Sequence, residues 1–246
     1  MSNWVIGKVI EVNWWTPSLF SIKVAADIEG FKAGQFTKLA LDIDGKRVAR
    51  AYSFVNSPAD PLLEFFLIEV QNGSLSERLA QLSEGDDLWV YNKPSGYFVL
   101  DEVPPGETLW MLSTGTAVGP FLSIIGDGKL WKQFDRVVLV HGVRLNTDLC
   151  YQDLIRATEK LFPQFTYVPL VSREKPENGL SGRVTDILKN NQLVEYCNMT
   201  SMPQNSHFML CGNPDMVKDT VTLLQEMGFK KHRRAEPGHI TVEQYW

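Results

Sequence analysis

Apolar and polar residues alternate along several short segments of the first hundred residues. This period of two is typical of half-buried strands, and it predicts six of them, at residues 4–12, 19–25, 34–41, 50–58, 62–70 and 86–91. Asp44-Gly45 predicts a tight turn between the third and fourth strands, and Asn56-Ser57-Pro58 ends the fourth. Short strands at such regular spacing predict a small antiparallel barrel.

The pattern changes near residue 101. Pro104-Pro105-Gly106 interrupts the chain, and beyond it apolar segments of strand length alternate with helical segments, as in a parallel sheet. The expected strands are residues 108–112, 137–141, 167–171 and 207–211. The expected helices begin near Phe121, Arg183 and Pro214. We therefore predict a two-domain protein, with a β-barrel domain at residues 1–101 and an α/β domain at residues 102–246.

Composition and charge exclude several classes of protein. The chain has 246 residues, of which 44% are hydrophobic and 22% charged, as expected for a globular protein. Its net charge is −5, which argues against nucleic-acid binding. No apolar run approaches the roughly 18 residues of a membrane span, and Met1-Ser2-Asn3-Trp4 does not begin a signal peptide. We expect a cytoplasmic protein that does not bind membranes.

The cysteines and histidines argue against a bound metal. Cys150, Cys197 and Cys211 lie far apart in the sequence, and the four histidines show no metal-ligand spacing. Reduced thiols are expected in the cytosol. If the protein carries out redox chemistry, its redox group is therefore expected to be organic.

The fourth predicted strand carries residues suited to a large anionic and aromatic ligand. In Arg50-Ala51-Tyr52-Ser53, a period of two places Arg50 and Tyr52 on one face. A guanidinium can grip a diphosphate with paired N–H donors, and a tyrosine ring can lie on a flat heterocycle. A serine hydroxyl can donate a hydrogen bond to a ring nitrogen. An edge strand with a solvated arginine is the alternative interpretation of this segment.

Two glycine-containing loops follow strands of the second domain. Residues 113–121 form a small-residue loop between a strand and a helix, which is the phosphate-binding arrangement of dinucleotide folds, although the sequence is not G-x-G-x-x-G. Residues 207–216 form an apolar strand that ends in Cys211-Gly212, followed by Asn213-Pro214 at a helix start. A buried, inert thiol is the alternative for Cys211.

Three arginines are expected at one edge of the parallel sheet. Arg144 and Arg173 follow predicted strands, and Arg183 follows a flexible turn. Ligands of open α/β sheets bind where the strands end. Arginine and the neighbouring Ser172 suit a 2′-phosphate, so we expect NADP rather than NAD. Each arginine by itself is better explained as a solvated surface residue, and only the three together with Ser172 favour NADP.

A glycine turn and a short helix follow the fifth predicted strand, from Asn72-Gly73 to Leu82. Ser74 and Glu77 have the spacing of a capping box. The free amides at the start of a helix suit a pyrophosphate, whereas a plain connecting helix is the alternative.

These motifs together resemble the ferredoxin–NADP reductase superfamily. The chain has R-x-Y-S, a glycine-serine turn, T-G-T-x-x-x-P-F, C-G-N-P-x-M and a terminal aromatic residue, in the family's order. The resemblance implies a Greek-key barrel that binds FAD non-covalently and a Rossmann-like domain that binds NADP(H). It implies FAD contacts by Arg50, Ala51, Tyr52, Ser53, Phe66, Leu67, Ile68, Ser74, Leu75, Ser76, Thr116, Tyr245 and Trp246. It implies NADP contacts by Gly115, Thr116, Arg144, Ser172, Arg173, Arg183, Cys211, Gly212, Asn213 and Asp215.

The resemblance also implies a reaction. Hydride transfer between nicotinamide and flavin needs ring contact and orientation more than a strong acid or base. The implied catalytic residues are Ser53, Cys211, Glu243 and Tyr245. Glu243 would assist proton delivery, and Tyr245 or Trp246 would shield the flavin as in the bacterial reductases of the family. A last strand packed on the core is the alternative for this tail.

The family's partner would be an acidic one-electron carrier, ferredoxin or flavodoxin. A basic run of this acidic chain could dock such a carrier by charge, or could simply be solvated; it comprises Lys230, Lys231, Arg233 and Arg234. We expect a monomer. A flavin reductase, the reductase component of an oxygenase, and a non-catalytic flavin- and nucleotide-binding module remain as alternative functions. The missing iron–sulfur cysteines count against the oxygenase reductase, and the tail and the three arginines count against the flavin reductase.

Overall fold

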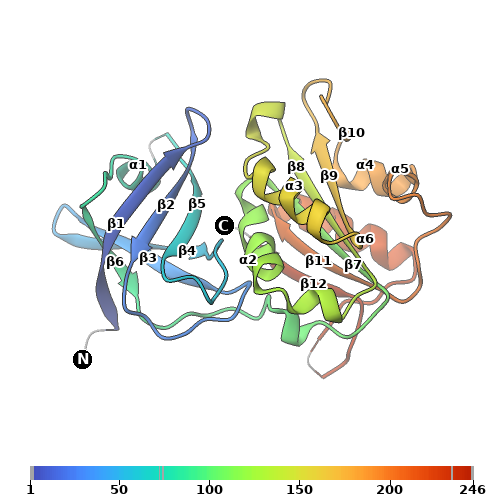
Figure 1. Cartoon of the computed structure of the whole chain (residues 1–246), viewed down its shortest axis with the longest axis horizontal. Helices are drawn as coiled ribbons and strands as arrows, with labels where there is room; N and C mark the ends of the chain where they lie inside the picture. Colours follow the sequence, from blue (N-terminus) through green and yellow to red (C-terminus); the bar gives the residue numbers. More distant parts are fainter. Residues whose placement is uncertain (1–2, 72, 74, 234, 245–246) are drawn as a thin grey trace. The chain divides into compact units, whose positions relative to one another are not determined.

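The chain folds into two compact units (Figure 1). The computed structural model describes residues 3–71, 73, 75–233 and 235–244. The first unit comprises Met1–Val99 and Gly119–Gly128, and the second comprises Leu100–Val118 and Lys129–Trp246. The segment 119–128 thus belongs by its packing to the first unit, although it lies within the sequence of the second.

The first unit is built on a six-stranded antiparallel sheet, which confirms the predicted antiparallel barrel. Its strands are β1 (Trp4–Trp14), β2 (Leu19–Ala25), β3 (Phe36–Ile43), β4 (Lys46–Ser53), β5 (Leu63–Ile68) and β6 (Asp87–Tyr91). Their order is β4-β3-β6-β1-β2-β5, in which β6 returns to lie between β1 and β3. Asp44 and Gly45 form the predicted two-residue turn with φ values of 50° and 74°, and Ile43 pairs with Lys46.

The two edge strands of this sheet are joined to each other. Phe54, directly after β4, forms an antiparallel bridge with Phe65 of β5, and the N–H of Val55 donates to the carbonyl of Glu64 at 2.9 Å. Phe54 and Phe65 are both fully buried in the barrel core. Burial of side chains of this size stabilises the fold by roughly 1.5–3 kcal/mol each. The strand that carries the R-x-Y-S motif is therefore held at both its edges where the motif ends.

Two helices complete the first unit. Helix α1 (Ser76–Leu79) buries Leu79 in the barrel core. Helix α2 (Gly119–Asp127) is attached by the Ser123 hydroxyl, which donates to the Asn56 carbonyl at 2.7 Å. The ring of Phe121 also packs edge-on against Phe98.

The second unit is built on a parallel sheet, as predicted, which has six strands rather than the four expected. Its strands are β7 (Thr108–Thr114), β8 (Arg136–Val143), β9 (Phe165–Val171), β10 (Leu180–Ser181), β11 (Ser206–Gly212) and β12 (Ile240–Gln244). Their order is β10-β9-β8-β7-β11-β12, so the chain first builds away from β7 on one side and then returns to build on the other. This reversal makes the carboxyl ends of β7 and β11 a topological switch point, where ligands bind in open α/β sheets.

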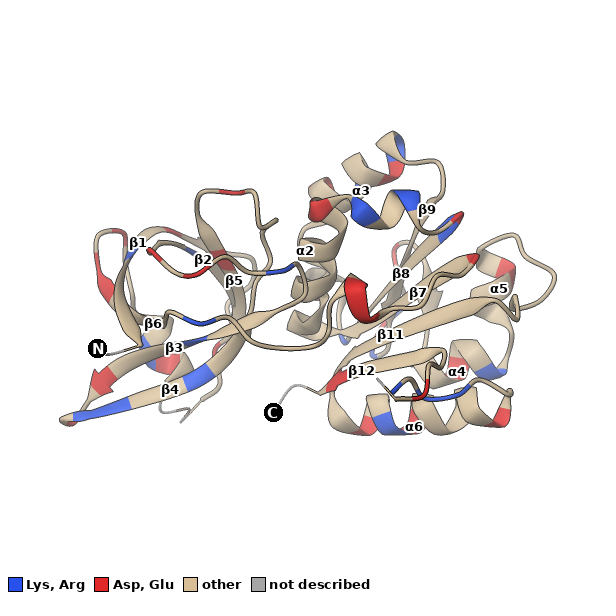
Figure 2. Cartoon of the chain, turned by 90° about the horizontal axis from the view of Figure 1, so that it is seen from below, with Lys and Arg blue, Asp and Glu red and all other residues tan. Residues whose placement is uncertain are grey.

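Helices cover both faces of the parallel sheet. The helical segments of this unit are η1 (Leu100–Glu102), η2 (Gly115–Val118), η3 (Lys129–Lys132), η4 (Asn146–Asp148), α3 (Gln152–Leu161), α4 (Val184–Lys189), α5 (Gln192–Tyr196) and α6 (Pro214–Glu226). Figures 1 and 2 show α3 on one face and α4, α5 and α6 on the other. In the described part of the chain, no helix is long and apolar enough to cross a membrane.

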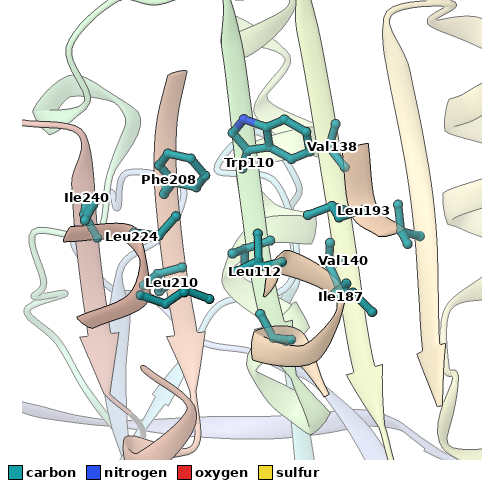
Figure 3. Packing of buried hydrophobic residues seen from close by; sticks show 14 of the residues in the cluster. Trp110, Leu112, Val138, Val140, Ile187, Leu193, Phe208, Leu210, Leu224 and Ile240 are labelled. Carbon is teal, nitrogen blue, oxygen red and sulfur yellow. The ribbon is translucent and has the colours of Figure 1, made fainter. Parts of the chain in front are cut away.

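The core between the sheet and helices α4–α6 is large and apolar (Figure 3). Every second side chain of β7, β8 and β11 points into it, because a strand alternates its faces. These sheet residues are Trp110, Leu112, Val138, Val140, Phe208 and Leu210. Ile187, Leu193 and Leu224 contribute from α4, α5 and α6. The Trp110 indole N–H is satisfied by the Ser206 hydroxyl at 3.0 Å. This core keeps the strand ends that carry the nucleotide motifs in a fixed register.

Candidate functional site

The R-x-Y-S motif occupies the last four residues of β4. In the register with β3, Arg50 lies opposite Leu39 and Tyr52 opposite Thr37. Arg50 and Ala51 are exposed, Tyr52 is half-buried, and Ser53 is only 7% exposed. The Arg50 guanidinium donates to the Ala49 carbonyl at 2.8 Å, which holds its stem along the strand. The strand therefore presents an exposed cation beside a partly buried ring, a combination that fits the diphosphate and the flat ring of FAD.

Burial keeps Tyr52 uncharged. Its pKa is raised to about 12, chiefly because burial disfavours the phenolate, while the nearby Arg50 opposes the rise. At neutral pH the side chain is a neutral phenol, able to stack on a heterocycle and to donate one hydrogen bond.

The predicted contacts from β5 lie next to the end of β4. The bridge between Phe54 and Phe65 is flanked by Ser53 on one strand and Phe66 on the other. Phe66 and Leu67 are buried, whereas Ile68 is 38% exposed. Leu67 packs in the barrel core, so its backbone is the part of it that can border a ligand outside the barrel.

The glycine turn after β5 leads into helix α1. Leu75 is the N-cap of α1, and its side chain makes no capping hydrogen bond. The helix is a single turn that begins at Ser76, and the capping box expected of Ser74 and Glu77 stays a prediction. The Ser76 hydroxyl accepts a hydrogen bond from the Val70 backbone at 3.3 Å and so closes the turn onto the end of the preceding strand. Ser74 lies outside the described residues.

The two glycine-containing loops of the second unit meet at the switch point. Cys211 of β11 pairs with Ser113 of β7, and the backbone N–H of Asn213 donates to the Thr114 hydroxyl at 3.0 Å. Gly212 has a φ of 141°, and a Cβ atom there would lie 2.1 Å from the Thr114 hydroxyl oxygen. Only glycine permits this close approach of the two loops.

The first of these loops is a 3₁₀ turn rather than the direct start of a helix. Gly115, with a φ of 57°, begins η2, and Thr116 is buried within it. The Gly115 carbonyl accepts a hydrogen bond from Nε2 of His141 at 3.2 Å, so the imidazole proton is on Nε2. Burial lowers the pKa of His141 to about 4, which keeps the ring neutral. His141 was missed from the sequence, although its place at the end of a wholly apolar strand was a signal.

Cys211 and Glu243 form a register pair on neighbouring strands. Cys211 is 0% exposed, and burial raises the pKa of its thiol well above the usual value, with the Glu243 carboxylate adding to the rise. Burial raises the pKa of Glu243 to about 7. Among the described residues, its buried Oε2 atom has no hydrogen-bond partner. A carboxyl group that titrates near neutrality suits proton exchange.

Asn213 has a structural task of its own. Its side-chain oxygen accepts hydrogen bonds from the N–H groups of Asp215 and Met216 at 3.0 and 3.2 Å, and so caps helix α6, with Pro214 in the first turn. Asp215 is exposed in the same turn.

The three predicted arginines do follow neighbouring parallel strands. Arg144 comes after β8, Arg173 after β9 and Arg183 after β10, and all three side chains are exposed. The N–H of Arg173 donates to the carbonyl of Arg144 at 3.0 Å. Both the N–H and the hydroxyl of Ser172 donate to the Val143 carbonyl, at 3.1 and 3.0 Å. Three cations on adjacent loops fit a doubly charged phosphate.

The tail and the basic run are partly described. The last strand, β12, is the alternative raised for the tail and is present at residues 240–244, whereas Tyr245 and Trp246 lie outside the described residues. Lys230, Lys231 and Arg233 are exposed. Arg234 also lies outside the described residues.

The chain matches two protein families over most of its length. Residues 9–99 match the oxidoreductase FAD-binding domain, and residues 111–222 match the oxidoreductase NAD-binding domain. These two spans contain the R-x-Y-S and T-G-T motifs, respectively.

Relatives are similar to this chain over its full length. The flavodoxin/ferredoxin–NADP reductase of Escherichia coli (strain K12) is 49% identical over 248 residues, with 100% of each chain covered. The ferredoxin–NADP reductase of Pseudomonas aeruginosa is 39% identical, over 99% of this chain and 98% of that one. A crystal structure of a ferredoxin NADP+ reductase from Neisseria gonorrhoeae, with bound FAD and NADP, is 33% identical, covers 100% of both chains and superposes with a TM-score of 0.95. The present chain belongs to the flavodoxin/ferredoxin–NADP reductase family.

Proposed function

We propose specific roles for the residues of this FAD- and NADP-linked oxidoreductase, which transfers electrons between NADP(H) and a small carrier protein. Membership of the family establishes the enzyme class and both cofactors. The observation that carries the assignment is the hydrogen bond between Thr114 and Asn213, which joins the T-G-T and C-G-N-P loops at the switch point of the sheet.

The first unit supplies the FAD contacts. Arg50 would pair with the diphosphate, and Tyr52 would lie against the flavin with its neutral phenol ring. Four further residues of β4 and β5 would pack around the rings of FAD: Ala51, Phe66, Leu67 and Ile68. The amides of Ser74, Leu75 and Ser76 would donate to the pyrophosphate, because the first amides of a helical turn have no partner within the turn.

The second unit supplies the NADP contacts. Five residues at the switch point would surround the nicotinamide half of the nucleotide through their backbones: Gly115, Thr116, Gly212, Asn213 and Asp215. The cluster of Arg144, Arg173 and Arg183 would hold the 2′-phosphate, joined by Ser172 once its hydroxyl turns away from Val143.

Four residues would act at the reacting rings. FAD supplies the chemistry that links two-electron hydride transfer with one-electron transfer. Ser53 would donate a hydrogen bond to the flavin ring. The neutral thiol of Cys211 would limit how deeply the nicotinamide ring enters the site. Glu243, with its raised pKa, would exchange a proton near neutral pH. Tyr245 would shield the flavin, together with Trp246.

The carrier would dock through the basic run of Lys230, Lys231, Arg233 and Arg234. Three of these side chains are exposed, and an acidic carrier would be steered to them by charge. Exchange of Lys230 and Lys231 for glutamate would raise KM for flavodoxin and flatten its dependence on salt. The ferricyanide reduction rate would stay the same, whereas an unchanged KM for every carrier would exclude this docking surface. A monomeric state and a cytoplasmic location remain predictions.

An anaerobic titration of the purified protein, followed by flavin absorbance, tests the function. We expect a yellow protein that NADPH bleaches rapidly and NADH bleaches poorly. Equal bleaching by both nucleotides would favour a general flavin reductase. Bleaching by neither would favour a non-catalytic electron-transfer module. A colourless protein that FAD does not reconstitute would overturn the assignment of Arg50, Tyr52 and Ser53.

A further inference from the structure

Asn146 connects the loop that follows β8 to the loop that follows β9. Its backbone N–H and its side-chain Nδ2 both donate to the same carboxylate oxygen of Glu174, the latter at 2.8 Å. Nδ2 also donates to the carbonyl of Lys175 at 2.9 Å, and Oδ1 accepts from the N–H of Glu177 at 3.0 Å. One asparagine therefore uses both ends of its side chain to bind three residues of the opposite loop, Glu174, Lys175 and Glu177.

This connection lies between two of the three clustered arginines. Asn146 is two residues from Arg144, and its partner Glu174 directly follows Arg173. The two arginines are also joined through their backbones, by the bond from the Arg173 N–H to the Arg144 carbonyl. The loops leave the same end of the sheet, because β8 and β9 are parallel (Figure 1). The spacing of the two loop backbones that carry Arg144 and Arg173 is therefore set by a backbone bond on one side and by Asn146 on the other.

The connection between the two loops also holds a negative charge, the carboxylate of Glu174. Its exposed carboxylate lies in the loop that carries Arg173, where a phosphate would have to approach. Two N–H donors of Asn146 occupy one of its oxygens and so hold the negative charge toward the loop after β8. Another nearby acidic group, Asp148, accepts a hydrogen bond from the N–H of Leu145 at 3.2 Å. A carboxylate released from Asn146 could pair with a neighbouring guanidinium or repel the ligand.

We propose that Asn146 is a positioning residue for NADP selectivity: it holds Arg144 and Arg173 at a fixed spacing and keeps the Glu174 carboxylate away from the 2′-phosphate. This inference rests on the proposed binding of the 2′-phosphate by the three arginines. Asn146 itself touches no part of the nucleotide in this scheme. Its loss would therefore weaken recognition of the phosphate without changing the step of hydride transfer.

The test compares ligands that differ only by the 2′-phosphate. Binding of 2′,5′-ADP and of 5′-AMP to the FAD-loaded enzyme is measured by calorimetry for the wild type, Asn146→Ala and Asn178→Ala. Asn178 is an exposed asparagine of the same loop as Glu174 and serves as the matched control. We expect Asn146→Ala to weaken 2′,5′-ADP roughly three- to tenfold, the effect of losing one or two net hydrogen bonds, and to leave 5′-AMP unchanged. Steady-state kinetics would show a higher KM for NADPH at unchanged kcat.

A second substitution isolates the charge. Glu174→Gln removes the negative charge but keeps an oxygen that Asn146 can bind. In the Asn146→Ala background, we expect Glu174→Gln to restore most of the affinity for 2′,5′-ADP, whereas in the wild type it changes little. No restoration would overturn the electrostatic part of the proposal.

The remaining outcomes separate this inference from the function on which it rests. If Asn146→Ala weakens both ligands equally, or neither, the proposed role of Asn146 is wrong. Arg173→Ala is measured in parallel. If this variant also loses affinity for 2′,5′-ADP and 5′-AMP equally, or for neither, the proposed arginine site itself is wrong. If Arg173→Ala weakens only 2′,5′-ADP and Asn146→Ala does not, the arginine site is supported and only the proposed role of Asn146 is wrong.

Discussion

The Thr114 hydroxyl lies 3.0 Å from the backbone nitrogen of Asn213 and accepts its hydrogen bond. The two residues are 99 positions apart in the sequence and close the ends of adjacent strands. The loops that follow β7 and β11 therefore act as one surface. This arrangement depends on the glycine between Cys211 and Asn213.

Gly212→Ala should destabilise the protein and impair nucleotide binding. The new Cβ would stand 2.1 Å from the Thr114 hydroxyl oxygen, on a backbone with a φ of 141°. We expect a loss of about 2 kcal/mol or more in the free energy of unfolding, measured by urea denaturation, together with a weaker Kd for NADP. Gly228→Ala is the matched control, since Gly228 has a φ of 95° but no described atom within 4 Å of a new Cβ. Equal losses for both variants would show that crowding at Thr114 is unimportant.

Ser53→Ala should keep FAD bound but slow its reduction. Ser53 is buried at the end of β4, so the barrel should tolerate the loss of one oxygen atom. The removal of one donor to the reacting ring should lower the stopped-flow rate with NADPH by about tenfold or more. Ser57→Ala, four residues further on, should leave the rate unchanged. An unchanged rate for Ser53→Ala would remove Ser53 from the catalytic set.

Arg173→Ala should discriminate between the two nicotinamide cofactors. The loss of a charge-assisted contact to the 2′-phosphate should raise KM for NADPH by about tenfold to a hundredfold and leave KM for NADH nearly unchanged. Arg156→Ala removes a cation from helix α3 and serves as the control for net charge. Equal effects of Arg173→Ala on both cofactors would place Arg173 outside the phosphate site.

Glu243→Gln should change how stability depends on pH. The pKa of Glu243 rises from near 4.5 in the unfolded chain to about 7 in the folded protein, because burial disfavours the ionised carboxylate. Its contribution to stability is therefore complete below pH 4.5 and is lost as the pH rises through 7. We expect Glu243→Gln to be more stable than the wild type by about 1–3 kcal/mol at pH 8, with little difference at pH 5.

Thermal unfolding of the FAD-loaded enzyme between pH 5 and pH 8 measures this effect. Glu226→Gln, on the exposed face of α6, should follow the wild type at every pH. A constant offset between Glu243→Gln and the wild type across this range would mean that Glu243 does not titrate there.

Local patterns predicted most of the fold. Alternation found the strands of the barrel, and the turn at Asp44-Gly45 was correct because positive φ values at two consecutive positions favour these residue types. The apolar strands of the second unit were equally clear, because both faces of a parallel sheet are buried. The helix after β5 was less predictable: Ser74 and Glu77 have the right spacing, but the turn is closed by Ser76 onto Val70, a contact that spacing does not reveal.

The candidate site was predictable where short motifs specify it and not where distant loops meet. T-G-T and C-G-N-P were visible in the sequence, whereas the bond between Thr114 and Asn213 depends on the adjacency of β7 and β11. His141 and Asn146 were missed for the same reason. Each acts through a partner more than 20 residues away, at Gly115 and Glu174. Only the order of the strands brings such residues together.

The assignment of α2 to the first unit has a consequence for the design of fragments and chimaeras. The chain leaves the first unit after Val99, re-enters it at Gly119 and leaves it again after Gly128. A fragment that ends near the predicted boundary at residue 101 would lack Ser123 and Phe121, which bind Asn56 and Phe98. Exchange of nicotinamide modules between related reductases at a single junction would thus import a foreign helix into the flavin module. Productive chimaeras need two further crossovers, one on each side of α2.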